Sequence, residues 1–149
     1  NEYGIKRIVD QQFSLAKKII AKGLVPIIEP EVDINAKDKK NIESFLKTEI
    51  SKQLSKMKKD EYVMFKFTIP DLPNFYDSLL HYKNVVRIVA LSGGYDRDKA
   101  CELLKGNKKM IASFSRALLE GLNINQSDEE FSNTLKNSIE QIYNASVKK

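Results

Sequence analysis

A chain of 149 residues is long enough for one domain with its own core, and 42% hydrophobic residues argue against a disordered protein. The single cysteine, Cys101, excludes a disulfide framework and a thiolate metal site. The net charge of +5 comes from 25 basic and 20 acidic residues mixed along the chain. The mixing, for example around Lys37, Lys39 and Lys40, indicates solvated helix ends and not a nucleic-acid-binding stripe, while a modest positive charge would suit a phosphorylated small molecule.

The sequence shows no membrane-spanning apolar run and no signal peptide, so we expect a cytoplasmic protein without a membrane partner. No group of His, Cys and acidic residues has the spacing of metal ligands, and we expect no metal and no other cofactor. The first residue is Asn1 and not Met, which suggests a fragment or a processed product. Cys101, between Ala100 and Glu102, is expected to be a small core residue.

The first half of the chain alternates helix and strand. A helix is predicted over about 5–22 and ends at Gly23, a strand follows over 24–29, a long helix over about 36–57, and a second strand over 62–69. The first helix has its apolar residues on one face: Ile5, Ile8, Val9, Phe13, Ala16 and Ile20.

The second half continues the alternation. We predict a short helix over about 74–81, a strand over 85–91, a helix over about 96–104 and a strand over 110–113, which leads into another short helix. Ser127-Asp128-Glu129-Glu130 is a capping box that opens the last helix. The apolar stripe of this helix is predicted to be Phe131, Leu135, Ile139 and Ile142.

Strands separated by helices indicate parallel pairing with right-handed crossovers, and the near-continuous apolar strand 85–91 indicates a sheet covered on both faces. We expect one α/β domain over 1–149. Its four βα units amount to half of a TIM (β/α)8 barrel, which has eight units over about 250 residues. Such a half-barrel would leave one sheet face and both edges open, so we expect self-association or pairing with the other half.

Lys66 is the most unusual residue of the sequence, because it lies in the middle of an apolar strand between two phenylalanines. Strand alternation places Met64, Lys66 and Thr68 on one face of the strand and the phenylalanines on the other. A desolvated lysine tends to lose its proton, and the neutral amine can form a Schiff base with a carbonyl compound. The alternative is a lysine on the wet face of a half-covered sheet.

Polar residues follow each predicted strand at its carboxyl end, where parallel α/β folds place their chemistry. Glu29-Pro30-Glu31 offers two carboxylates on one side of a stiff turn, as proton transfer requires. Ser92-Gly93-Gly94 and Ser113-Phe114-Ser115-Arg116 offer backbone amides, hydroxyls and a guanidinium that suit a phosphate. Each signal alone is typical of an ordinary surface turn; together they point to one site.

Four segments of the chain resemble a known enzyme family. The run 23–32 looks like the fifth strand of class I (Schiff-base) fructose-bisphosphate aldolase. The run 65–70 resembles the sixth strand of the form found in some bacteria, 89–95 the seventh and 111–118 the eighth. Their order and spacing agree along essentially the whole chain, whereas the family's first four strands have no counterpart here.

The resemblance implies a role for each polar residue. Lys66 would form the Schiff base with the substrate ketone, and Glu29 would transfer protons, with Glu31 as its neighbour. The phosphate of the sugar would be held by Ser92, Gly93, Ser115 and Arg116. The expected partner is a phosphorylated sugar, and the chain by itself would be inactive or weakly active. Two alternatives stay open: another Schiff-base barrel enzyme of the transaldolase or deoxyribose-phosphate aldolase kind, or a catalytically inactive fragment that binds polyanions weakly.

Overall fold

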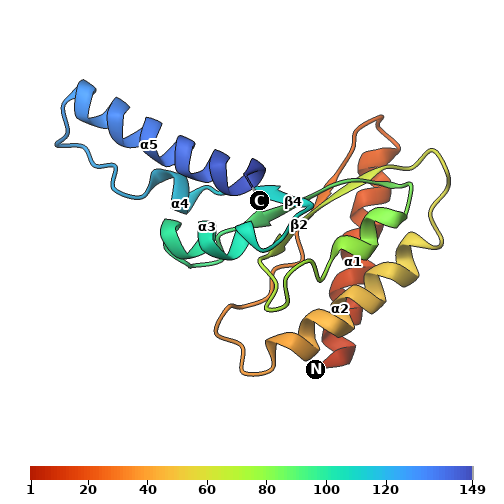
Figure 1. Ribbon diagram of the computed structural model, residues 1–149. Helices are drawn as coiled ribbons and strands as arrows, with labels where there is room; N and C mark the ends of the chain where they lie inside the picture. The colour runs from red at the N-terminus through yellow and green to blue at the C-terminus, as the bar shows by residue number, and fades with distance from the viewer. Residues whose placement is uncertain (149) are drawn as a thin grey trace.

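A four-stranded parallel sheet lies at the centre of the protein in a computed structural model, which describes residues 1–148 (Figure 1). The strands lie in the order of the sequence: β1 Ile27–Ile28, β2 Val63–Thr68, β3 Val85–Leu91 and β4 Met110–Ala112. The predicted α/β class and the parallel pairing are therefore confirmed. β1 is shorter than the predicted strand 24–29, because Pro26 and Pro30 lack the N–H group that a strand ladder needs.

Helices connect and flank the strands. α1 and α2 pack against each other beside β1, whereas α3 packs against α4 and α5 near β4 (Figure 1). The predicted short helix 74–81 is a single 3-10 segment, η1. The helical elements are α1 Glu2–Ile20, α2 Lys39–Leu54, η1 Asp77–His81, α3 Arg97–Lys105, α4 Arg116–Leu119 and α5 Asp128–Val147.

The core lies on the face of the sheet that carries the phenylalanines of β2. Phe65 and Phe67 are fully buried, and their rings stack with centroids 5.3 Å apart. Phe13 of α1 contacts Phe65 at 6.2 Å, and Tyr76, before η1, stacks on Phe67 at 4.0 Å. Aromatic burial of this kind dominates core energetics and fixes the helices on this face.

The opposite face of the sheet is open toward the amino ends of the strands and covered toward their carboxyl ends. Ile27 is 50% exposed, Met64 is only half-buried, and Arg87 is exposed. Val89, on the same face of β3, is only 6% exposed, and Thr68 is 1% exposed. The predicted cover on both faces is therefore present over the carboxyl half of β3 and absent toward its amino end, where the face is open as a half-barrel predicts.

Helix α5 buries only part of its predicted apolar stripe. Phe131 and Ile139 are 43% and 51% exposed, whereas Leu135 and Ile142 are half-buried and Ile142 packs against the core. The fully buried residues of the helix are Ala145 and Ser138, which accepts a hydrogen bond from Arg97 Nη1 at 2.7 Å. The helix also lines an open groove of about 460 Å³ beside β4, whose residues are Ile111, Ala112, Ser113, Phe114, Leu118, Ile139, Ile142, Tyr143, Ser146 and Val147.

Other local predictions hold. The capping box is formed in both directions, because the Ser127 hydroxyl accepts from the Glu130 backbone and the Glu130 side chain accepts from the Ser127 backbone. Cys101 is a core residue at 3% exposure, and burial raises the pKa of its thiol. Among residues 1–148, no helix is long and apolar enough to cross a membrane.

Two phenylalanines test which face of the structure holds the core. Phe65→Ala should lower the free energy of unfolding by about 3–5 kcal/mol, because it empties a fully buried ring position. Phe131→Ala, the matched control at a partly exposed site, should lower it by less than about 1 kcal/mol. Urea unfolding followed by far-UV circular dichroism measures both. Equal losses would mean that α5 packs with its predicted stripe inward.

Candidate active site

A cleft of about 140 Å³ opens at the carboxyl ends of the four strands. All seven residues that the sequence singles out line it, because the carboxyl ends of parallel strands meet at one edge of a sheet. Two further residues line the cleft: Leu91, an apolar residue that the sequence analysis did not single out, and Ser113, which it named only as part of the segment 113–116. The full lining is Glu29, Glu31, Lys66, Leu91, Ser92, Gly93, Ser113, Ser115 and Arg116.

Lys66 and Glu29 form an ion pair across the first two strands. The Lys66 Nζ atom lies 3.2 Å from Glu29 Oε2, with the side chains 19% and 51% exposed. Strand register explains the pairing: Ile28 lies opposite Phe65, so the next residue of each strand falls side by side. The phenylalanines that flank Lys66 in sequence point to the other face. Lys66 therefore faces a carboxylate at proton-transfer distance and not an apolar pocket.

The two carboxylates of the cleft lie on a fixed turn. Pro30 between Glu29 and Glu31 is buried, while both glutamates are exposed to the cleft. Gln12 of α1 donates from Nε2 to the Glu29 carbonyl at 3.2 Å, which ties this turn to the first helix. The backbone that carries the two carboxylates is thus held by a buried proline and by a hydrogen bond from α1.

The Gly-Gly turn after β3 lines the cleft next to the Lys66 strand. Gly93 and Gly94 have φ angles of +65° and +102°, which side-chain-bearing residues rarely adopt. A Cβ atom on Gly93 would also lie 3.0 Å from Ile34 Cγ2. Ser92 is buried, and its carbonyl accepts from the Tyr95 N–H at 3.0 Å to close the turn. Glycine here permits both the turn and close approach to the cleft.

The exit of β4 supplies the cationic side. The Ser113 N–H donates to the Ala90 carbonyl at 2.8 Å, which continues the ladder past β4, and Ser115 and Arg116 follow exposed. α4 has only four residues, and Ser115 makes no capping bond through its side chain. The predicted helix N-terminus therefore contributes little, and the capacity of this side for an anion rests on the guanidinium and the hydroxyls.

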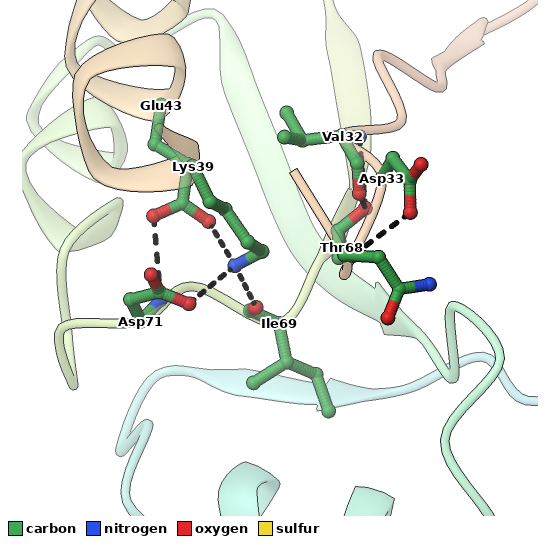
Figure 2. A network of polar contacts seen from close by, with 8 residues as sticks. Val32, Asp33, Lys39, Glu43, Thr68, Ile69 and Asp71 are labelled. Atoms are coloured by element: carbon green, nitrogen blue, oxygen red, sulfur yellow. Dashed lines mark hydrogen bonds and ion pairs between the residues drawn. The ribbon is translucent and has the colours of Figure 1, made fainter. Parts of the chain in front are cut away.

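A charge cluster around the buried Lys39 lies just beyond the end of β2, next to Ile69 (Figure 2). Lys39 Nζ donates to Glu43 at 2.5 Å, to Asp71 at 2.9 Å and to the Ile69 carbonyl at 3.0 Å. The expectation that Lys39 is a solvated charge is wrong, since only 4% of it is exposed. The sequence carried a signal for this burial, because Lys39 and Glu43 fall on the same face of α2 as the core residues Leu46, Ile50 and Leu54.

The cluster fastens α2 to the backbone that follows β2. Burial by itself would lower the pKa of Lys39, but the hydrogen bonds and charges of Glu43 and Asp71 outweigh it and raise that pKa above 10.5. The ammonium is therefore the form that the fold stabilises. Through the Ile69 carbonyl it fixes the chain just beyond Lys66 and Thr68.

The chemistry open to this cleft is amine chemistry beside a carboxylate, with a guanidinium and hydroxyl groups supplied from beyond β3 and β4. No protein-family model matches the chain. Within residues 1–148, no three His, Cys, Asp or Glu side chains are grouped so that they could hold a metal ion.

Removing one partner of the buried cluster should be costly, and removing the pair should not. Lys39→Met leaves the Glu43 carboxylate buried without its cation and should lower the free energy of unfolding by about 3–5 kcal/mol. The double variant Lys39→Met/Glu43→Leu should regain most of this loss, because Asp71 can still be hydrated. Chemical denaturation at pH 7 measures both, and a double variant as unstable as the single one would contradict the assignment.

The same variants carry a pH signature. The folded-state pKa of Lys39 is raised, so its stabilising contribution is fully present below the unfolded value of 10.5 and is lost as pH rises through the folded value. The unfolding free energy of the wild type should therefore fall more steeply above about pH 10.5 than that of the double variant. Parallel slopes would show that Lys39 is not held in its charged form.

Proposed function

We propose that this chain is the half of a (β/α)8 barrel that carries the Schiff-base lysine of a class I fructose-bisphosphate aldolase. The reaction is the reversible cleavage of fructose 1,6-bisphosphate to dihydroxyacetone phosphate and glyceraldehyde 3-phosphate. The observation that carries the proposal is the contact of Lys66 Nζ with Glu29 Oε2 at 3.2 Å, in a cleft that Arg116 also lines. An amine, a proton-transfer group and an anion-binding group are the parts that imine chemistry on a sugar phosphate requires.

The first stage of the reaction is imine formation on Lys66. Glu29 takes a proton from the ammonium, and the neutral Nζ attacks the ketone carbon of the sugar. The carbonyl oxygen takes a proton from the attacking nitrogen and becomes the hydroxyl of the carbinolamine, which leaves as water when Glu29 returns its proton. The C=N bond then replaces the C=O bond, and its nitrogen is protonated.

The second stage breaks the carbon–carbon bond. Glu29 or Glu31 acts as base and removes the proton from the hydroxyl on the carbon that becomes the aldehyde. The bond from this carbon to the carbon next to the imine breaks, and its electron pair moves toward the imine. The protonated nitrogen accepts that pair, so that an enamine remains on Lys66. Protonation of the enamine carbon and hydrolysis of the imine release the second product and restore the amine.

The phosphate group orients the sugar. Arg116, Ser115 and the Ser92-Gly93 turn line the cleft beyond the ends of β3 and β4, whereas the carboxylates line it beyond the end of β1, at the other side of the sheet. A phosphate beyond β3 and β4 would bind through charge-assisted hydrogen bonds, the stronger class of polar contact. It would hold the ketone carbon toward Lys66 and keep the acidic phosphate away from Glu29 and Glu31.

A half-barrel with free sheet edges also needs a second protein surface to close it. The sheet has free edges at β1 and β4 within the described residues, and apolar side chains flank the β4 edge. Parallel edges of this kind can be closed by four further βα units, from a second copy of the chain or from the other half of a barrel. We propose that the protein works in such an assembly and has weak turnover at most as a single copy.

Borohydride trapping tests the proposed chemistry. Incubation with dihydroxyacetone phosphate and borohydride should reduce the imine and fix the sugar to Lys66, as peptide mapping by mass spectrometry would show. Lys66→Met should abolish the adduct, whereas Lys58→Met, at an exposed lysine outside the cleft, should leave it unchanged. A sugar-dependent adduct on another lysine would refute the assignment.

Two comparisons sharpen the test. Arg116→Ala should raise the dihydroxyacetone phosphate concentration for half-maximal trapping by roughly tenfold or more, since a charge-assisted hydrogen bond contributes about 1.5–3 kcal/mol. Trapping with dihydroxyacetone, which lacks the phosphate, should be insensitive to this substitution. A preference for deoxyribose 5-phosphate over dihydroxyacetone phosphate would indicate a different Schiff-base aldolase.

Light scattering at micromolar concentration tests the assembly. We expect a concentration-dependent rise in mass above 17.1 kDa. Ile139→Lys, in the apolar groove beside β4, should weaken association because it places a charge in that interface. Ile124→Lys, at a residue that is 97% exposed and lies outside the groove, is the control and should leave association unchanged. A stable monomer with full aldolase turnover would contradict the half-barrel proposal.

A further inference from the structure

Thr68 is a buried polar residue that the proposed reaction does not use. It follows Lys66 by two positions on the same strand, shares its face, and is 1% exposed. Its hydroxyl makes two hydrogen bonds to one residue of the next segment: Oγ1 donates to the Val32 carbonyl at 2.8 Å and accepts from the Val32 N–H at 2.9 Å (Figure 2). One hydroxyl thus satisfies both backbone groups of Val32.

These two hydrogen bonds take the place of strand pairing at the point where the β1–β2 ladder ends. The ladder of β1 with β2 ends at Ile28 opposite Phe65, and Pro30 cannot donate a ladder bond. Beyond that point the Lys66–Glu29 ion pair attaches the turn to β2 through side chains alone, and the backbone of the turn is held to β2 by the Thr68 hydroxyl. The Thr68 hydroxyl closes the turn from its far end, and Gln12 holds the Glu29 carbonyl at its near end at 3.2 Å.

The methyl group of the same residue reaches the other wall of the cleft. A Cβ atom on Gly93 would lie 3.4 Å from Thr68 Cγ2, so the methyl packs directly against the Gly-Gly turn. The residue after Thr68 is itself fixed, because the Ile69 carbonyl accepts from the buried Lys39. Thr68 therefore links the end of the carboxylate turn, at Val32, to the glycine turn.

We infer that Thr68 is a positioning residue: its hydroxyl sets the place of Glu29 relative to Lys66, and its methyl sets the place of the Gly93 turn. As a statement about catalysis this rests on the proposed function, whereas as a statement about the Lys66–Glu29 contact it does not. A residue needed only for packing would be a valine, since a buried hydroxyl is kept where a specific bond is made.

Two substitutions separate the functions of the two halves of this side chain. Thr68→Val keeps the methyl and removes the hydroxyl, whereas Thr68→Ser keeps the hydroxyl and removes the methyl. Thr68→Val should slow borohydride trapping of dihydroxyacetone phosphate on Lys66 by about tenfold, with little change in the half-saturating concentration. Thr68→Ser should trap at near the wild-type rate but need a higher sugar phosphate concentration.

The comparison is made on folded protein, with the fraction folded taken from urea unfolding of each variant. A residue with only a structural role would lower stability and leave the trapping rate per folded molecule unchanged. Equal trapping rates in the wild type and in folded Thr68→Val would overturn the inference while leaving the proposed function standing.

A sugar-free measurement decides the inference even if the wild type forms no adduct, a result that would refute the proposed function. Competitive labelling with acetic anhydride reports the reactivity of Lys66 relative to the exposed Lys58. Thr68→Val should raise the relative labelling of Lys66 by about fivefold, because the ammonium loses its fixed carboxylate, and Thr68→Ser should not. Identical labelling in all three proteins would overturn the role of Thr68.

Discussion

The alternation of side chains along β2 is the constraint on which the rest of the structure depends. One strand sends Phe65 and Phe67 into the core, where helices pack on them, and sends Lys66 and Thr68 to the opposite face. The core and the cleft are thus set by a single register, and a slip of one residue would exchange them. Burial of Phe65 and Phe67 on the core face fixes the backbone of β2. It thereby fixes the position from which Lys66 extends on the opposite face.

Polar contacts fix the turns beyond the end of β2, which hydrophobic burial does not position. Hydrophobic packing is non-directional, so it fixes β2 as a body but not the geometry of the turns beyond it. The Lys39 cluster and the Thr68 hydroxyl supply directional bonds at that point, to the Ile69 carbonyl and to both backbone groups of Val32. Each is buried, where a hydrogen bond is strong and a missing partner is costly.

The sequence predicted those features that depend on local pattern. Periodicity found every helix and strand, the capping box at Ser127 was visible as a motif, and the placement of polar residues at strand ends brought all seven predicted site residues to one cleft. The errors have long-range causes. On α5, Phe131 and Ile139 of the predicted stripe are exposed, whereas Ser138 is buried and accepts a hydrogen bond from Arg97, which is far away in sequence. Lys39 is buried because its ammonium donates hydrogen bonds to Asp71 and to the Ile69 carbonyl, which lie in the segment after β2. The Thr68–Val32 bonds join two strand exits and have no local signature at all.

The open face of the sheet bears on how Lys66 can react. Its side chain is 19% exposed and its neighbour Glu29 is 51% exposed, so water reaches both groups in a single copy of the chain. Water screens their interaction and would compete for the carbonyl carbon of the proposed sugar substrate, whereas a closed barrel would exclude it and strengthen every polar contact in the cleft. The residues that hold Lys66, Glu29 and the glycine turn lie within this chain, whereas the face of the sheet around Lys66 is partly open to water. In the proposed assembly, this chain would fix the positions of the groups, and closure of its open face would set how strongly they act.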